Sequence, residues 1–250
     1  MEQTVTIQQS IDRFVTQNAR GVWHGKCYTY KPSRYGAMDI PMGVIAITGV
    51  LLVWNLAVIH YISRFFYEFV RRRRDVPAEY VGRKVVHILG GGVTALLVPL
   101  FFEGYYWIVS LMAVLLAGYV FFWRRWRMMY WFQVKENSYE VHFAVAYGLM
   151  IFVGFYLRNI WIGLIPVLFM SFGDATTGLV RAFTQKRHIK SWDGTFAMFI
   201  VCSAIALWKL GLYGIGVSAL VSLIERIPGV DDNVTIPCVS AACVFLYTLL

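Results

Sequence analysis

Charged residues are scarce in this sequence. Asp, Glu, Lys and Arg make up 15% of its 250 residues, whereas soluble domains average about 25%. Hydrophobic residues account for 58% of the chain. This composition excludes an ordinary water-soluble domain and is typical of a helical bundle in lipid.

Cysteine is also scarce, and its four positions follow no metal-binding pattern. Cys27, Cys202, Cys238 and Cys243 form no CxxC pair and no Cys/His spacing, so neither a disulfide framework nor a zinc site is expected. Residues 1–37 are polar and lack an early apolar core, so no cleavable signal peptide is expected either. The sequence contains no GxxxxGK[ST] and no protein-kinase motif, which argues against both common nucleotide-binding folds.

Charge-free apolar runs divide most of the chain into eight segments. A bilayer-spanning helix needs about 20 mainly apolar residues, and several of these runs are shorter. Short or Gly/Pro-interrupted segments, as at Gly90–Gly92 and Pro237, must line protein or a cavity, because lipid cannot satisfy loose backbone groups. Arg158 marks a tight turn between the fourth and fifth runs. We expect an all-α polytopic transmembrane helix bundle of about eight spans: 40–63, 85–102, 104–123, 141–157, 159–173, 194–208, 210–224 and 233–250.

Lysine and arginine gather on one side of this predicted bundle. The connections 64–84, 124–140, 174–193 and 225–232 hold 16 of them, against 7 on the opposite side. Because cytoplasmic loops are enriched in Lys and Arg, the first side is predicted to face the cytoplasm. The net charge of +9 is therefore better explained by membrane topology than by nucleic-acid binding.

The chain divides into a polar N-terminal tail, residues 1–37, and a transmembrane domain, residues 38–250. The tail carries five of the seven cations on the opposite side, which weakens the assignment of sides. An amphipathic helix around residues 4–20 that lies on the membrane surface is an alternative placement for it.

The unusual polar residues all fall on the predicted cytoplasmic face. They come from four separate parts of the chain that meet at one depth. Ionisable residues in membrane segments are costly to bury, so they indicate a functional site. They are Arg83, Lys84, His87, Asp174, Lys190, Ser191, Asp193, Thr195, Glu225, Asp231, Asp232 and Asn233, together with Gly173.

The chemistry of this set is mixed. Carboxylates with Asn and hydroxyl groups suit a hard cation such as Mg²⁺. Lys and Arg suit phosphates, and glycines let backbone N–H groups approach an anion at a helix start. A site with all three parts has what phosphoryl transfer needs.

Four sequence blocks resemble the polyprenol kinase family, which includes dolichol kinase, phytol kinase and the CTP-dependent diacylglycerol kinase. The blocks are RKVVHILGGG (83–92), GDATTGLVR (173–181), KSWDGTFAMF (190–199) and ERIPGVDDNVTIP (225–237), and the resemblance covers residues 80–250. Members are membrane enzymes that phosphorylate a lipid alcohol, typically with CTP. Asp193 departs from the pattern, in which Glu is expected.

The resemblance implies CTP as phosphoryl donor, Mg²⁺ as cofactor, and roles for individual residues. Asp174 and Asp232 are expected to be catalytic, and we expect one of them to take the proton of the alcohol. Asp174, Glu225 and Asp232 are expected to bind the metal. The implied nucleotide-binding residues are Lys84, His87, Arg181, Lys190, Ser191, Asp193, Gly194, Thr195 and Asn233.

The function expected is that of a CTP-dependent dolichol or polyprenol kinase, a multi-pass membrane protein whose pocket faces the cytoplasm. Its partners would be CTP, a membrane lipid alcohol and the surrounding lipids, with no nucleic acid. A phytol, geranylgeraniol or diacylglycerol kinase and a CTP-using lipid cytidylyltransferase are alternatives. Outside enzymes, a membrane transporter also gathers charges near broken helices.

Several residues have structural alternatives. Arg71–Arg74 fit a topology anchor better than a substrate clamp. Gly90–Gly92 suit close helix packing as well as phosphate contact. His87 suits either a buried structural histidine or the pocket, and His60 and His142 are expected to be structural.

Overall fold

The computed structural model describes residues 22–23, 26–27, 40–73, 76–184 and 190–250. In these ranges the fold is almost entirely helical. The exception is a short antiparallel pair, β1 (Val22–Trp23) with β2 (Lys26–Cys27). The surface helix predicted around residues 4–20 lies outside the described residues and stays a prediction.

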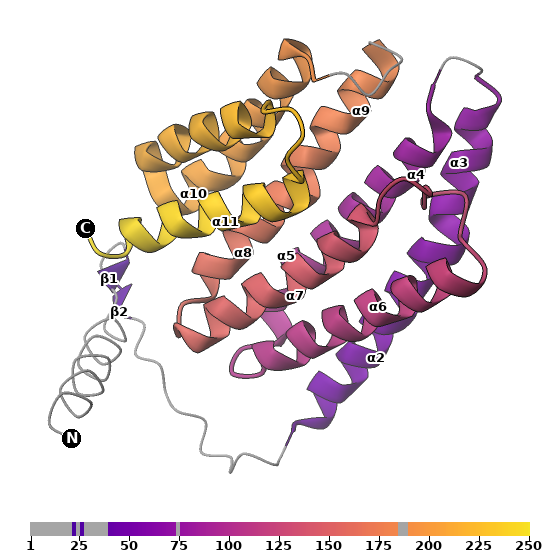
Figure 1. Cartoon of the computed structure of the whole chain (residues 1–250). Helices are drawn as coiled ribbons and strands as arrows, with labels where there is room; N and C mark the ends of the chain where they lie inside the picture. Colours follow the sequence, from indigo (N-terminus) through magenta and orange to yellow (C-terminus); the bar gives the residue numbers. More distant parts are fainter. Residues whose placement is uncertain (1–21, 24–25, 28–39, 74–75, 185–189) are drawn as a thin grey trace, which may run out of the picture.

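Several of the helices join end to end into longer rods that contain a π-helical stretch, labelled η. The elements are α2 (Met42–Ala57), η1 (Val58–Ile62) and α3 (Ser63–Arg71); α4 (Ala78–Val85), η2 (Val86–Gly92) and α5 (Val93–Phe101); α6 (Tyr106–Trp126); α7 (Tyr139–Tyr156); α8 (Ile160–Leu168), η3 (Phe169–Gly173) and α9 (Asp174–Thr184); α10 (Trp192–Glu225); and α11 (Asp232–Tyr247). Figure 1 shows them packed side by side, with α4 between α3 and α9.

Six helices in the described part of the chain are long and apolar enough to cross a membrane. They are Met42–Arg71, Ala78–Phe101, Tyr106–Trp126, Tyr139–Tyr156, Ile160–Thr184 and Trp192–Glu225, and α11 is a shorter apolar helix. The prediction of an all-α, multi-pass membrane bundle is therefore confirmed.

Each of the eight predicted apolar runs falls mainly in one of these helices, but most boundaries differ. The first helix continues past residue 63 to Arg71, and the second begins at Ala78, seven residues before the predicted start. The fifth run was expected to end at residue 173, whereas the helix continues as α9 to Thr184. The sixth and seventh runs fall within α10, which is one element of 34 residues.

Helix α10 nevertheless turns back on itself at Gly211. That glycine has φ 56° and ψ −144°, far from helical values. A straight helix of this length would measure about 51 Å. Instead, Lys190 just before its start donates a hydrogen bond to the backbone carbonyl of Glu225 at its end. The two halves therefore lie against each other, as the predicted close pair requires.

Close backbone contact also joins α7 to α8. Arg158 in the turn between them has φ 54°, and Asn159 caps α8 by accepting a hydrogen bond from the backbone nitrogen of Trp161 at 3.2 Å. A Cβ on Gly163 would lie 1.8 Å from the carbonyl oxygen of Met150. A larger residue would force these helices apart, so Gly163 sets their spacing.

The π-helical stretches expose backbone carbonyls, and tryptophans bind two of them. Trp131 Nε1 donates to the carbonyl of Ile59 in η1, and Trp54 Nε1 donates to that of Leu89 in η2, each at 2.8 Å. Within lipid such groups need an internal partner, and these indole contacts stabilise the widened turns. The sequence pattern gave no indication of π-helices, which are frequent at functional sites.

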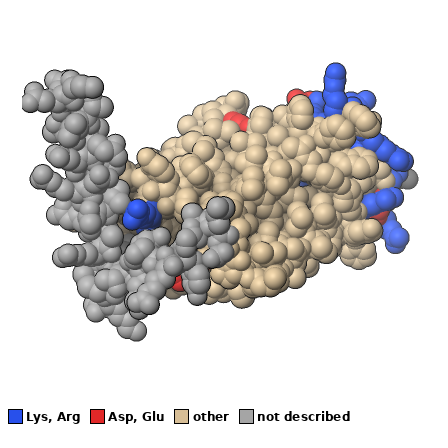
Figure 2. Space-filling view, turned by 90° about the horizontal axis from the view of Figure 1, so that it is seen from below, with Lys and Arg blue, Asp and Glu red and all other residues tan. Residues whose placement is uncertain are grey.

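Charge is distributed unevenly over the described surface. Figure 2 shows Lys and Arg gathered at one end of the molecule and a broad surface with few charges beside it. Arg71–Arg73 lie where α3 ends and are exposed. Their exposure at a helix end agrees with a topology anchor.

Candidate active site

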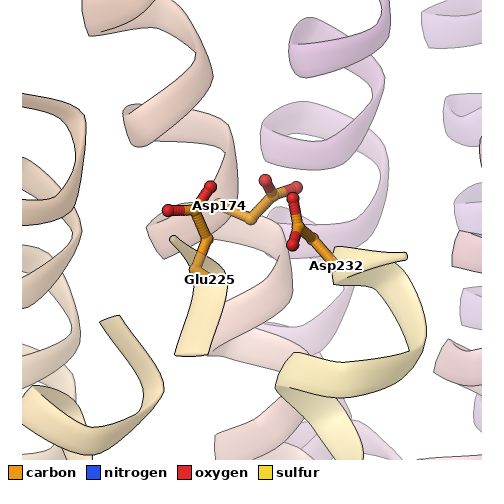
Figure 3. Close-up of side chains that lie close together, drawn as sticks. All are labelled: Asp174, Glu225 and Asp232. Atoms are coloured by element: carbon orange, nitrogen blue, oxygen red, sulfur yellow. The ribbon is translucent and has the colours of Figure 1, made fainter. Parts of the chain in front are cut away.

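Three carboxylates from three helices meet where α9 begins, α10 ends and α11 begins. One oxygen from each of Asp174, Glu225 and Asp232 lies within 4.8 Å of the others. Asp174 and Glu225 are buried, and Asp232 is half-buried. Figure 3 shows the three side chains converging on one small volume. We call these three residues the carboxylate cluster.

A cation accompanies each member of the carboxylate cluster. Lys84 Nζ lies 2.7 Å from Asp174 Oδ2. Lys190 Nζ lies 2.8 Å and 3.1 Å from the two oxygens of Asp232. The paired charges reduce the cost of burying each ion, and they bring the predicted phosphate-binding lysines next to the predicted metal ligands.

The third pair, Arg181 with Glu225, is a bidentate ion pair. Arg181 Nη1 and Nη2 donate to the two oxygens of Glu225 at 2.7 Å and 2.9 Å. Both side chains are buried. Two parallel hydrogen bonds of this kind fix the guanidinium and the carboxylate relative to each other, so α9 and the end of α10 are held in register.

The segment that opens α10 is tied to α9 by hydrogen bonds. Thr177 Oγ1 donates to the carbonyls of Gly173 at 3.1 Å and Gly194 at 3.2 Å. Ser191 places its carbonyl oxygen 3.5 Å from Arg181 Nη2. A Cβ on Gly194 would lie 2.5 Å from Arg181 Nε, so this position must be glycine for Arg181 to keep its place.

Lys190 holds the other side of this segment. Besides Asp232, its ammonium group donates to the carbonyls of Glu225 and, at 3.1 Å, of Ile227. Hydrogen bonds from this one lysine therefore hold the end of α10, the loop after it and the start of α11 together.

His87 lies on the inner side of the carboxylate cluster. Its Nδ1 is 3.4 Å from Asp174 Oδ2. The imidazole stacks on Phe143, with ring centroids 3.8 Å apart and an interplanar angle of 17°. Stacking and burial fix the ring beside Asp174.

The remaining predicted residues occupy different positions around the site. Asn233 is buried and donates from Nδ2 to the carbonyl of Tyr139 at 3.2 Å, while its Oδ1 has no hydrogen-bond partner among the described residues. Thr195 is buried and donates to the carbonyl of Ser191 at 3.1 Å. Asp193 is exposed at the start of α10.

The glycine run serves packing in this structure. A Cβ on Gly91 would lie 2.6 Å from the ring of Phe143, and one on Gly92 would lie 2.5 Å from the ring of Phe172. Of the two alternatives for these glycines, the contacts favour close packing.

Two contacts of the site were not predicted from the sequence. The ammonium group of Lys84 lies 5.0 Å from the ring centroid of Tyr80, one helical turn before it. His142 forms an ion pair or hydrogen bond with Asp231, the residue that caps α11. The i, i+4 spacing of Tyr80 and Lys84 was a usable signal, whereas no local pattern links His142 to Asp231.

The donor set fits a magnesium ion. Three carboxylates supply hard oxygen ligands of the kind that Mg²⁺ prefers, and Mg²⁺ commonly completes its octahedral shell with water and substrate phosphates. No histidine or cysteine joins the carboxylate cluster within the described chain, which disfavours zinc.

Comparison with known proteins gives no assignment. No protein-family model, no curated protein and no solved structure matches the chain. Its function must therefore be inferred from the site.

Proposed function

We propose that the chain is a CTP-dependent lipid alcohol kinase of the dolichol or polyprenol type, which converts CTP and a polyprenol to CDP and a polyprenyl phosphate. The observation that carries the proposal is the carboxylate cluster of Asp174, Glu225 and Asp232 inside a membrane bundle, with a cation paired to each member. CTP as the donor rests on the family resemblance of the four sequence blocks.

The residues divide into metal ligands and phosphate contacts. Asp174, Glu225 and Asp232 would hold Mg²⁺, which when bound supplies charge neutralisation at the phosphate oxygens. Lys190 is half-buried and lies against Asp232, so it can turn toward a triphosphate. Lys84 and Arg181 are buried and supply fixed positive charge. Positioning and charge are the main catalytic terms in phosphoryl transfer.

The proposed reaction forms one bond and breaks one. The alcohol oxygen attacks the γ-phosphorus, a new O–P bond forms, and the bond from that phosphorus to the β,γ-bridging oxygen breaks. CDP leaves with the electron pair. The hydroxyl proton passes to Asp174 or Asp232, one of which is expected to act as the general base.

The proposal includes an orientation. Lys and Arg concentrate at the end of the bundle where α3 and α6 finish, with Arg71–Arg73 on α3 and Arg124, Arg125 and Arg127 at the end of α6. The positive-inside rule then favours a cytoplasmic position for this end. With α10 counted as two crossings and α11 as one, the bundle has eight, and CTP and Mg²⁺ reach the site from the cytoplasm.

The test uses purified protein in lipid nanodiscs with Mg²⁺, a polyprenol and CTP labelled either at the α- or at the γ-phosphate. A kinase transfers the γ-label to the lipid. The α-label in the lipid with release of pyrophosphate would identify a cytidylyltransferase instead. Absence of any nucleotide-dependent lipid product with polyprenol, phytol or diacylglycerol would refute the proposal and favour transport.

Matched variants connect the activity to the site. Asp174→Asn and Asp232→Asn are expected to lower turnover by about 100-fold or more, because each removes a charged ligand. Glu103→Gln, at an exposed carboxylate outside the cluster, serves as the control and keeps wild-type turnover. Near-normal turnover in both Asp variants would contradict the assigned roles.

A further inference from the structure

A largely apolar pocket lies beside the carboxylate cluster, between η1, η2, α6 and α7. Its cavity volume is about 60 Å³. One water-sized group needs about 10–15 Å³ by this measure, so the pocket has room for a polar group and a few carbon atoms. Most of its wall is aliphatic or aromatic, including Ile59, Met112, Leu116, Val120, Phe132 and Phe143. A ligand for this pocket must therefore be mainly apolar.

Three buried polar side chains also line this pocket and are incompletely hydrogen-bonded within the described chain. The atoms without a partner are His87 Nε2, Tyr147 Oη and Glu140 Oε2, whereas His87 Nδ1 faces Asp174. These residues are only 1%, 4% and 5% exposed. Buried polar atoms are nearly always paired in folded proteins, so several unpaired atoms around one pocket indicate a ligand with a hydrogen-bonding group.

His87 connects this pocket to the carboxylate cluster. Its Nδ1 faces Asp174 Oδ2 at 3.4 Å, and the same ring forms part of the pocket wall. Because the ring is fixed by stacking on Phe143, a group bound to its other nitrogen would lie close to the predicted phosphoryl-transfer site.

We infer that this pocket binds the hydroxyl end of the acceptor alcohol, with His87 and Tyr147 holding the hydroxyl and the apolar wall holding the first part of the chain. The inference rests on the proposed kinase function. A hydroxyl is the single polar group of a polyprenol, which agrees with a few polar atoms in an apolar wall. A volume of about 60 Å³ holds only the hydroxyl and the first few carbon atoms, so the rest of a long chain extends into the surrounding lipid.

Tyr147→Phe tests the contact with the hydroxyl. A purely structural tyrosine with an unpaired buried hydroxyl would lose nothing on this change, and the melting temperature is expected to stay or rise. If the hydroxyl binds the alcohol, KM for polyprenol rises about 3- to 10-fold, as expected for one hydrogen bond, while KM for CTP stays the same. An unchanged polyprenol KM, or an equal rise in both constants, would overturn the contact.

Ala144→Phe tests the apolar wall, since Ala144 lines the pocket on α7. The added ring is expected to raise KM for polyprenol about tenfold or more by filling the space. Val145→Phe is the matched control, because Val145 is exposed on the same helix and introduces the same ring outside the pocket. Equal effects of the two substitutions would contradict the inference.

A photoreactive farnesol analogue bearing a diazirine tests binding without relying on turnover. The expected crosslinks lie in peptides of α6 and α7, decrease with excess polyprenol, and are lost in Ala144→Phe but kept in Val145→Phe. Crosslinks elsewhere, or crosslinks that Ala144→Phe leaves unchanged, would overturn the pocket assignment even if the protein is a kinase. Specific crosslinks without phosphoryl transfer would refute the kinase and leave the alcohol site standing.

Discussion

Replacing Arg181 by methionine provides a quantitative test of the buried ion pair. The change keeps an apolar stem but removes both hydrogen bonds to Glu225, whose side chain is 1% exposed. The nearest remaining cation is Lys190, whose Nζ lies 4.0 Å from Glu225 Oε1 and is already bonded to Asp232. Leaving a buried charge without its partner typically costs about 3–5 kcal/mol.

That cost converts to an observable shift. A domain of this size loses about 2–4 °C of melting temperature for each kcal/mol, so Arg181→Met should melt about 6–20 °C lower than wild type. Unfolding can be followed in detergent by tryptophan fluorescence, since the chain has nine tryptophans. Arg71→Met is the control: its pair with Glu68 is 3.6 Å long and exposed, and such pairs contribute about 0–1 kcal/mol.

The double variant Arg181→Met with Glu225→Met separates stability from function. Replacing a buried pair by apolar residues is often neutral or stabilising, so the double variant is expected to melt above the single one. It should still be inactive, because a proposed metal ligand and a fixed positive charge are both gone. If Arg181→Met melts like wild type, this account of the pair is refuted. It is also refuted if the double variant loses the sum of the melting-temperature decreases of Arg181→Met and Glu225→Met.

Further predictions concern packing and the metal. Gly194→Ala is expected to displace Arg181 and lower activity at least about tenfold, whereas Gly216→Ala on the same helix, where a Cβ meets no atom within 4 Å, should be neutral; a kinetic comparison decides. Gly163→Ala is expected to lower the melting temperature, because its Cβ would lie 1.8 Å from a carbonyl oxygen of α7; an unchanged melting curve would refute the close approach. Asp232→Asn should weaken binding of Mn²⁺, a paramagnetic substitute for Mg²⁺, by about tenfold or more in resonance titrations. Chelation should stop phosphoryl transfer in the wild-type protein while changing its melting temperature by only a few degrees, and a loss of fold on chelation would contradict a preformed site.

The helices were predictable because a helix that spans lipid needs a long run of apolar residues. In the described part of the chain, apolar runs bounded by charges marked the six long apolar helices and the shorter α11. The turn at Arg158 has the positive φ that a tight reversal needs. The convergence of Asp174, Glu225 and Asp232 was also predictable, because costly ionisable residues were confined to the ends of a few runs.

The contacts that complete the site were not predictable from local patterns. η2 widens the helix around His87, and η3 ends immediately before Asp174. A π-helical turn contains an extra residue, which rotates the side chains that follow it around the helix axis. Neither hydrophobic periodicity nor composition shows where such a turn occurs. The contact of His142 with Asp231 joins residues far apart in the sequence. For Gly90–Gly92, only the neighbouring rings of Phe143 and Phe172 favoured helix packing over phosphate contact.

The pairing of charges explains how three carboxylates remain together in a buried position. Repulsion among Asp174, Glu225 and Asp232 would separate them if each were alone, because charges interact strongly where water is excluded. Lys84, Arg181 and Lys190 each bind one carboxylate, so the six charges balance in pairs. These cations also suit phosphate. In the proposed enzyme, Asp174, Glu225 and Asp232 would hold the metal, and Lys84, Arg181 and Lys190 would supply positive charge to the nucleotide phosphates. On this proposal the same three cations balance the carboxylates in the unbound site and would contact phosphate in the bound one, so the buried cluster is stable without a metal.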